Sequence, residues 1–120
     1  MTAEEHFRRG VELFNRRQFF EAHEEMEDAM NALGDDAADW NFYLGLLRAA
    51  VANHKLADGE VQSAAFHLRA ALKFLAPYEA RHGGLKLGEL RAGLKAQLAN
   101  LLGAGAAVGP PPIPRIEFDR

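Results

Sequence analysis

Apolar side chains recur along this chain at the three- and four-residue spacing that places them on one face of a helix. The first such stripe follows Thr2, which forms the pattern of a helix-capping box with Glu5 three residues later. A tight connection at residues 15–17 separates it from a second stripe that ends before Gly34. Five helices are predicted: from Thr2 to the 15–17 connection, about 18–33, from a cap at Asp35 or Asp36 to about Ala57, about 60–75, and about 87–101.

The third predicted helix carries apolar residues on two different sides. One stripe consists of Trp40, Leu44, Leu47, Val51 and His54, and the other of Phe42, Leu46, Ala49 and Leu56. A helix that is apolar around most of its circumference is covered by neighbours on several sides. We therefore expect this helix to be buried at the centre of the fold.

The composition of the chain argues against β-strands. Alanine occurs 22 times, whereas the chain has one Thr, two Ile and four Val. Alanine favours helices and β-branched residues favour strands, so an all-α fold is predicted, with two antiparallel helical hairpins and a fifth helix. Residues 1–102 are expected to form one helical domain, and residues 103–120 an extended tail rich in Gly, Ala and Pro. Ile113, Ile116 and Phe118 favour partial docking of that tail on the helices.

Charge and missing residue types exclude several classes of function. The net charge of −3 lacks the basic excess of nucleic-acid binders, and no apolar run reaches the roughly 18 residues of a membrane span. No signal-peptide pattern is present, so we expect a cytoplasmic protein. The absence of cysteine excludes disulfides, thiolate metal sites and a cysteine nucleophile. The motifs GxGxxG, Walker A, HExxH and GxSxG are also missing, which argues against an enzyme.

The chemically richest segment is the second predicted helix, where His23 falls within the apolar stripe. Glu27 lies four residues later and can contact it, and Glu24 lies on the same side. One interpretation is structural: Glu27 or a backbone carbonyl orients the imidazole. Another is a metal site on His23, Glu27 and His54, which would take a divalent ion such as Zn²⁺ or Mn²⁺.

Two basic residues of the third helix favour the structural interpretation. If Arg48 and Lys55 face Glu24 and Glu27, ion pairs occupy the space that a cation would need. We therefore expect a non-enzymatic structural or interaction domain without a cofactor, whose partner is a second copy or another protein. The alternative is a metal-binding or small-molecule site, with hydrolytic chemistry among its uses. Its residues would be His23, Glu24, Glu27 and His54.

Three stretches of the first half form a recognisable pattern. They are Phe7-x-x-Gly10-x-x-Leu13-Phe14-Asn15, Phe19-Phe20-Glu21-Ala22-His23-Glu24-x-x-Glu27, and Gly45-Leu46-Leu47 with Ala50. This pattern resembles the DUF309 family of small helical proteins over about residues 3–75. The resemblance implies a compact helical bundle, found mainly in prokaryotes and chloroplasts, without an established biochemical function.

The chain departs from that family's usual pattern within the second helix and at third-helix positions expected to lie opposite it. Met30 stands where the family usually has Trp, and Arg48 where it usually has Gln. The family's third-helix His and its following Gly-Asn fall on Lys55 and on residues 59–60. The resemblance therefore implies a pocket altered into salt bridges, with His54 as a substitute for the displaced histidine.

Overall fold

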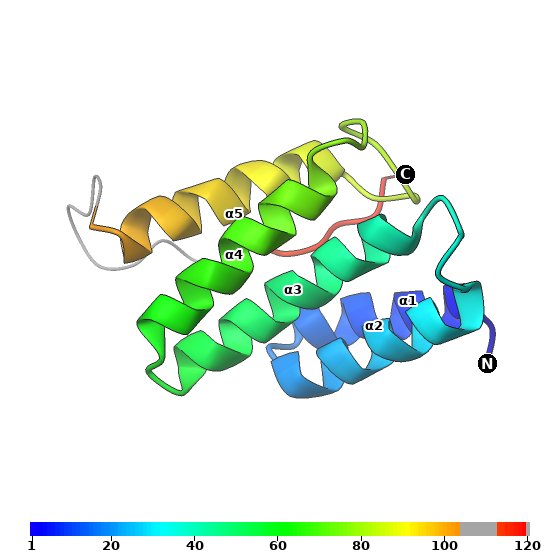
Figure 1. Ribbon diagram of the computed structural model, residues 1–120, viewed down its shortest axis with the longest axis horizontal. Coiled ribbons are helices and arrows are strands. Elements are labelled where there is room, and N and C mark those ends of the chain that lie inside the picture. The colour runs from blue at the N-terminus through cyan, green and yellow to red at the C-terminus, as the bar shows by residue number, and fades with distance from the viewer. Residues whose placement is uncertain (104–112, 120) are drawn as a thin grey trace.

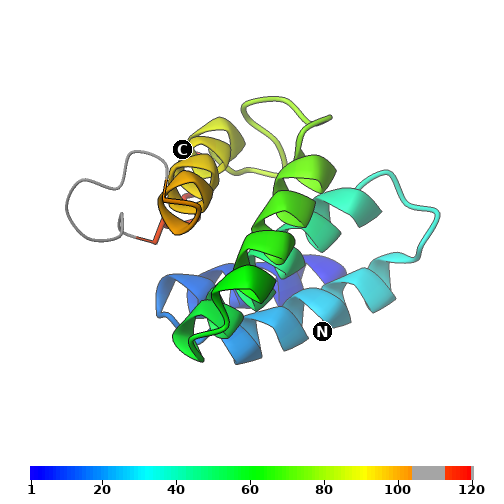
Figure 2. The same cartoon turned by 60° about the vertical axis from the view of Figure 1, so that its left-hand side comes forward.

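The computed structural model describes residues 1–103 and 113–119, and these contain five helices and no β-strand (Figure 1). The helices are α1 Ala3–Asn15, α2 Phe19–Leu33, α3 Trp40–Ala57, α4 Val61–Leu75 and α5 Leu87–Leu101. Each helix packs against the next along the chain. Helices α1 and α2 form one hairpin, α3 and α4 form another, and the contact between α2 and α3 joins the two hairpins. Figure 2 shows α5 on the α4 side of the molecule, away from α2. The all-α prediction is confirmed, and no described helix is long and apolar enough to cross a membrane.

The start of α3 differs from its prediction. Neither Asp35 nor Asp36 caps it, because the helix begins only at Trp40. Instead, the backbone N–H of Phe42 donates to the hydroxyl of Tyr78 at 3.1 Å. This cap comes from a residue that follows α4, so no local sequence pattern could indicate it. At the start of α1, by contrast, the predicted capping box between Thr2 and Glu5 is present.

Two glycines allow the helices of each hairpin to approach closely. A Cβ added at Gly10 of α1 would lie 2.9 Å from the Met26 side chain of α2. One added at Gly45 of α3 would lie 2.6 Å from Leu75 of α4. Interiors packed at this density do not accommodate an extra methyl group without movement. The two helices of each hairpin are therefore closely packed at these points.

The centre of the core is an aromatic group around Phe42, which is fully buried. Its ring centroid lies 5.8 Å from that of Phe7, 5.6 Å from Tyr78 and 4.7 Å from the imidazole of His82. These residues come from α1, α3 and the segment between α4 and α5. One side chain thus joins three parts of the chain.

Residues 113–119 lie across the helices as a strap, seen in red in Figure 1. Ile116 is 1% exposed, and the side-chain amide of Asn15 donates to its carbonyl at 2.9 Å and accepts from its N–H at 2.8 Å. The backbone N–H of Lys86 donates to the carbonyl of Glu117 at 2.9 Å. Ile113 and Phe118 also pack against the core, as their apolar character predicts. The predicted extended run at Pro110–Pro112 lies outside the described residues.

Gly93 has a packing role that the low helix propensity of glycine does not indicate. Glycine weakens a helix, and this position weakens the predicted fifth helix. In the structure, a Cβ at Gly93 would lie 2.6 Å from the Cβ of Pro114. The missing side chain therefore leaves room for the strap against α5.

Candidate functional site

His23 lies on the α3-facing flank of α2 and is half-buried. Its Nδ1 lies 3.1 Å from the carbonyl oxygen of Phe20, one turn earlier, and its ring packs on that of Phe20 at 5.4 Å. Of the two structural partners that the sequence allowed, the backbone carbonyl is therefore the one in contact. Glu27 is exposed and forms no hydrogen bond or ion pair among the described residues.

Two adjoining hollows lie beside His23 on the surface between α2 and α3. The first, about 310 Å³, lies between Glu27 and Arg48, and the second, about 220 Å³, between Phe20, His54 and Lys55. His23 and Val51 line both of them, so we call the pair the α2–α3 groove. The groove also includes Met30, Asn31, Trp40, Leu44 and Leu47. The predicted cluster residues thus meet along one surface feature, apart from Glu24, which lines a different groove beside α1.

The basic residues of the groove have partners other than the ones predicted. Arg48 donates from its guanidinium to Nδ1 of His67 at 2.9 Å, and Lys55 lies 3.4 Å from a carboxylate oxygen of Glu60. Within the described part of the chain, Glu24 and Glu27 form no ion pair with either base. The acids on α2 and the bases on α3 therefore flank the groove as separate charges.

The predicted metal ligands do not form a common site. The imidazoles of His23 and His54 both pack against the ring of Phe20. Nε2 of His54 also lies 3.7 Å from a carboxylate oxygen of Asp58. Among the described residues, the group of three whose ligand atoms lie within 4.8 Å of one another includes neither His23 nor His54. Glu24 lines a different groove from His23, Glu27 and His54, so the four residues predicted for the alternative site do not share one hollow.

The apolar stripe of α3 that lines the groove is less covered than predicted. Phe42, Leu46 and Ala49 of the other stripe are fully buried, whereas Leu47 and Val51 are only half-buried. The reason is that α2 and α4 cover the two flanks of α3 and no described element lies over the ridge between them. Val61, the first residue of α4, is likewise 43% exposed.

His67 stands at the edge of the same surface, and its pKa is lowered from the ordinary histidine value of 6.5. Burial is the largest cause, because it disfavours the charged imidazolium, and the positive charges of Arg48 and Lys55 add to it. The hydrogen bond from Arg48 requires a lone pair on Nδ1, which only the neutral ring with that nitrogen unprotonated offers.

An NMR titration of the His67 ring should therefore have its midpoint below pH 6.5. Replacing Arg48 with Gln should raise that midpoint only part of the way, since burial is the larger cause. Because the unfolded chain binds this proton more readily, the contribution of His67 to stability is present above pH 6.5 and is lost as the pH falls through the lowered pKa. Arg69→Gln on α4 is the matched control. An unchanged midpoint in Arg48→Gln would show that the guanidinium does not act on the ring.

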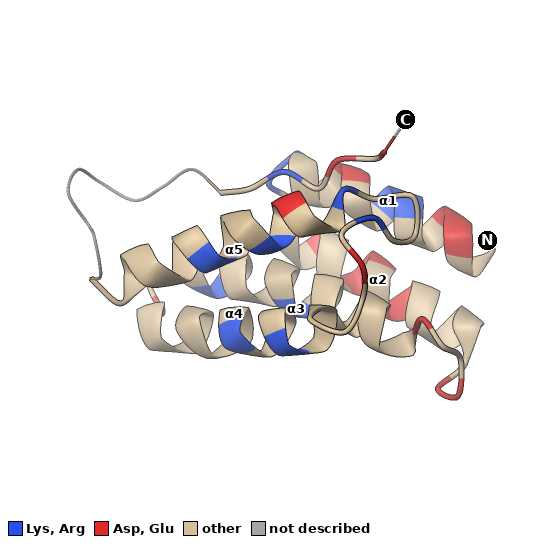
Figure 3. Cartoon of the chain, turned by 90° about the horizontal axis from the view of Figure 1, so that it is seen from above, with Lys and Arg blue, Asp and Glu red and all other residues tan. Residues whose placement is uncertain are grey.

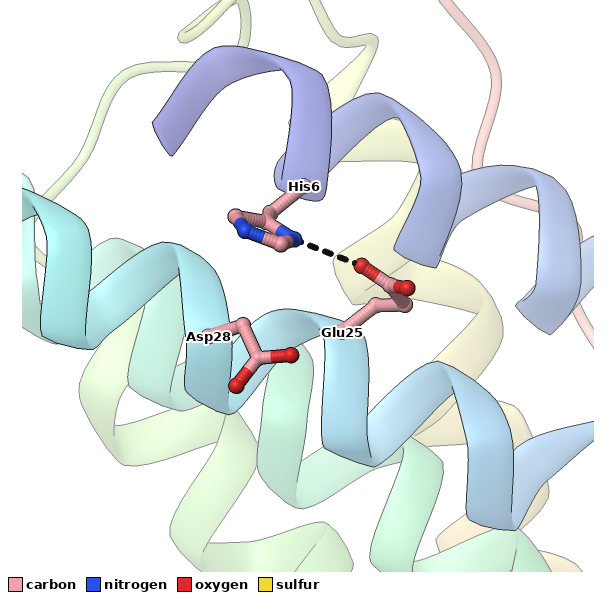
Figure 4. Close-up of side chains that lie close together, drawn as sticks. All are labelled: His6, Glu25 and Asp28. Carbon is pink, nitrogen blue, oxygen red and sulfur yellow. Dashed lines mark hydrogen bonds and ion pairs between the residues drawn. The ribbon is translucent and has the colours of Figure 1, made fainter. Parts of the chain in front are cut away.

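A second group of polar residues lies on the other flank of α2, where α1 covers it (Figure 4). His6 of α1 has its Nδ1 2.8 Å from a carboxylate oxygen of Glu25, and Asp28 lies one turn further along α2. His6 and Glu25 are half-buried and Asp28 is exposed.

The sequence analysis did not predict this group. The register of the first hairpin contains the signal that could have found it. His6 lies nine residues before Asn15 (15 − 6), and Asp28 nine residues after Phe19 (28 − 19), so the two are equally far from the turn. In an antiparallel hairpin, such residues lie opposite each other.

Comparison with known proteins gives a family but no activity. An uncharacterised protein of Aquifex aeolicus (strain VF5) is 33% identical over 98 residues, which is 82% of this chain. The aligned region spans 28% of that relative's length. No solved structure matches the chain. The family described as "Domain of unknown function (DUF309)" matches residues 7–66, half of the chain and the part that contains His23 and the groove. The chain therefore belongs to the DUF309 family, as its α1 and α2 motifs predict.

Proposed function

We propose that this chain is a non-enzymatic interaction domain that pairs with a second copy of itself through the α2–α3 groove. The observation that supports this most directly is the half-buried apolar stripe on the outer ridge of α3. Apolar side chains gathered on one exposed ridge and bordered by charges are typical of protein interfaces. Trp40, at one end of the stripe, is a residue type enriched in interface centres.

The distribution of charge around the groove favours a second copy as the occupant. Helix α2 carries five carboxylates and no Lys or Arg, whereas α3 and α4 carry only basic charges. Figure 3 shows this division, with red positions on α2 and blue positions on α3 and α4. A surface that is acidic on one side of an apolar ridge and basic on the other complements a copy of itself.

This charge division also selects one orientation of the dimer. A two-fold axis that runs parallel to α3 along the ridge places the acidic flank of each copy on the basic flank of the other. Glu27 and Arg48 line the same hollow, one from each of its two flanks. In this dimer, Glu27 of one copy therefore faces Arg48 of the other. An axis across the ridge would oppose acid to acid and is disfavoured.

Leu47→Glu should weaken this association at least tenfold, since it places a charge in the apolar centre of the interface. Sedimentation velocity over a concentration series measures the effect. Trp40 supplies a second measure, because it is the one Trp of the sequence and lines the groove. Its emission should shift to shorter wavelength as the concentration rises. Leu102→Glu, at a 54% exposed position outside the groove, is the matched control and should behave as the unmodified chain.

Charge reversal separates this dimer from other modes of association. Glu27→Arg and Arg48→Glu should each weaken it, and the double variant should associate more strongly than either single variant, since both facing pairs are restored. A chain that remains monomeric throughout the concentration series would contradict the proposal. Self-association with unchanged affinity in Leu47→Glu would place the interface elsewhere.

A further inference from the structure

We infer that His6, Glu25 and Asp28 form a binding site for a divalent transition-metal ion, with Zn²⁺ as the best-suited ion. The site lies between α1 and α2, on the opposite flank of α2 from the α2–α3 groove. The inference is therefore independent of the proposed dimer.

The ligand atoms already have nearly the spacing that coordination needs. Nδ1 of His6 lies 2.8 Å from the carboxylate of Glu25, and the ligand atoms of all three residues lie within 4.8 Å of one another. In a tetrahedral zinc site with bond lengths of about 2.0–2.2 Å, neighbouring ligand atoms are roughly 3.4 Å apart. That value lies between the 2.8 Å of the His6–Glu25 contact and the 4.8 Å limit for the whole group. Side-chain rotation alone can therefore bring the three ligand atoms to coordination distance. Figure 4 shows His6 and Glu25 pointing toward each other across the space between α1 and α2, with Asp28 beside them on α2.

The two helices that supply the ligands are held together near the site. Gly10, one turn after His6, packs against Met26, the neighbour of Glu25. At the turn end of the hairpin, farther from the site, the rings of Phe14 and Phe19 are in edge contact at 5.1 Å. Ordering the site therefore costs only side-chain freedom, which favours binding. A bound ion would in turn fix the first turns of α1 to the second half of α2.

Local charge favours a cation here. The groove beside the site is lined by Glu21, Glu24, Glu25, Glu27 and Asp28. Arg9 is the one basic side chain of that lining, and it forms no ion pair with these acids in the described part of the chain. Five carboxylates against one guanidinium leave a negative potential that attracts divalent ions.

The donor set determines the class of ion. One imidazole nitrogen with two carboxylates suits Zn²⁺ and, less tightly, Mn²⁺, whereas Ca²⁺ and Mg²⁺ prefer oxygen ligands alone. Three protein ligands leave a fourth position for water in a tetrahedral site. Binding would exchange the His6–Glu25 hydrogen bond for a bond from each of the two side chains to the ion.

Calorimetric titration of the untagged chain with Zn²⁺ tests the site. We expect one ion per chain, bound at micromolar concentration, and at least tenfold weaker binding in His6→Asn and in Asp28→Asn. At a hundredfold excess over Kd, Zn²⁺ should raise Tm by about 10 °C, and this rise should be lost in both variants. His54→Asn is the matched control and should bind as the unmodified chain.

Mn²⁺ added at substoichiometric amounts locates the ion directly, because it broadens the NMR signals of nearby rings. The signals of the His6 ring should broaden before those of His23. Millimolar or non-saturable binding, unchanged affinity in both variants, or first broadening of His23 would each overturn the inference.

Discussion

Phe42→Ala should lower the free energy of unfolding by about 3–5 kcal/mol, the largest effect we expect from a single substitution. The ring is fully buried and packs against Phe7, Tyr78 and His82, so its removal opens a cavity that residues from three segments line. Because a domain of this size is stabilised by only about 5–15 kcal/mol, the variant should be close to unfolding at 37 °C. Urea denaturation followed by circular dichroism measures the loss.

The control removes the same atoms from an exposed position. Phe66 of α4 is 62% exposed, so Phe66→Ala should change the free energy of unfolding by no more than about 0.5 kcal/mol. Equal losses in the two variants would mean that Phe42 is not the centre of the core.

Asn15→Ala should lower the free energy of unfolding by about 2–4 kcal/mol, although it removes only three heavy atoms. Its amide satisfies both backbone groups of Ile116, and each buried group left without a partner costs roughly 1–3 kcal/mol. Thermal or urea unfolding measures the effect. Asn41→Ala, at an exposed position of α3, is the matched substitution and should be almost neutral.

A double-mutant cycle with truncation distinguishes this cause from a defect in α1 itself. In a chain that stops at residue 112, Ile116 is absent and Asn15 has no backbone groups to satisfy. Asn15→Ala should then cost less than about 0.5 kcal/mol. The same loss in the full and the truncated chain would assign the effect to α1.

The helices could be predicted because the information that forms them is local. Apolar spacing, the Thr2 capping box and the turn residues at Gly34 and Gly59 each act within a few positions. The predicted cap at Asp35 or Asp36 was wrong because the group that satisfies the start of α3 comes from Tyr78. Caps supplied by distant residues cannot be found from local sequence.

The candidate site could be predicted only as a region. Periodicity placed His23, Glu27 and Arg48 near the surface between α2 and α3, where all three line one hollow. It could not assign their partners, because long side chains such as Arg48 reach several neighbours with equal ease, and here His67 on α4 is the one in contact. Periodicity also reports how apolar a face is, not whether another element covers it. The exposed ridge of α3 therefore emerges only from the three-dimensional arrangement.

The strap also sets an order of events during synthesis. The contact between Asn15 and Ile116 joins residues that are 101 positions apart, among the most distant pairs in the chain. The first hairpin, which ends at Leu33, leaves the ribosome before Ile116 and can form from local contacts, whereas the side of α1 that Ile116 covers has to wait until the strap has been synthesised. Until then, Asn15 and the neighbouring apolar surface remain open to chaperones or to other nascent chains. Closure of this long loop is thus the step at which we expect slow folding and aggregation to compete.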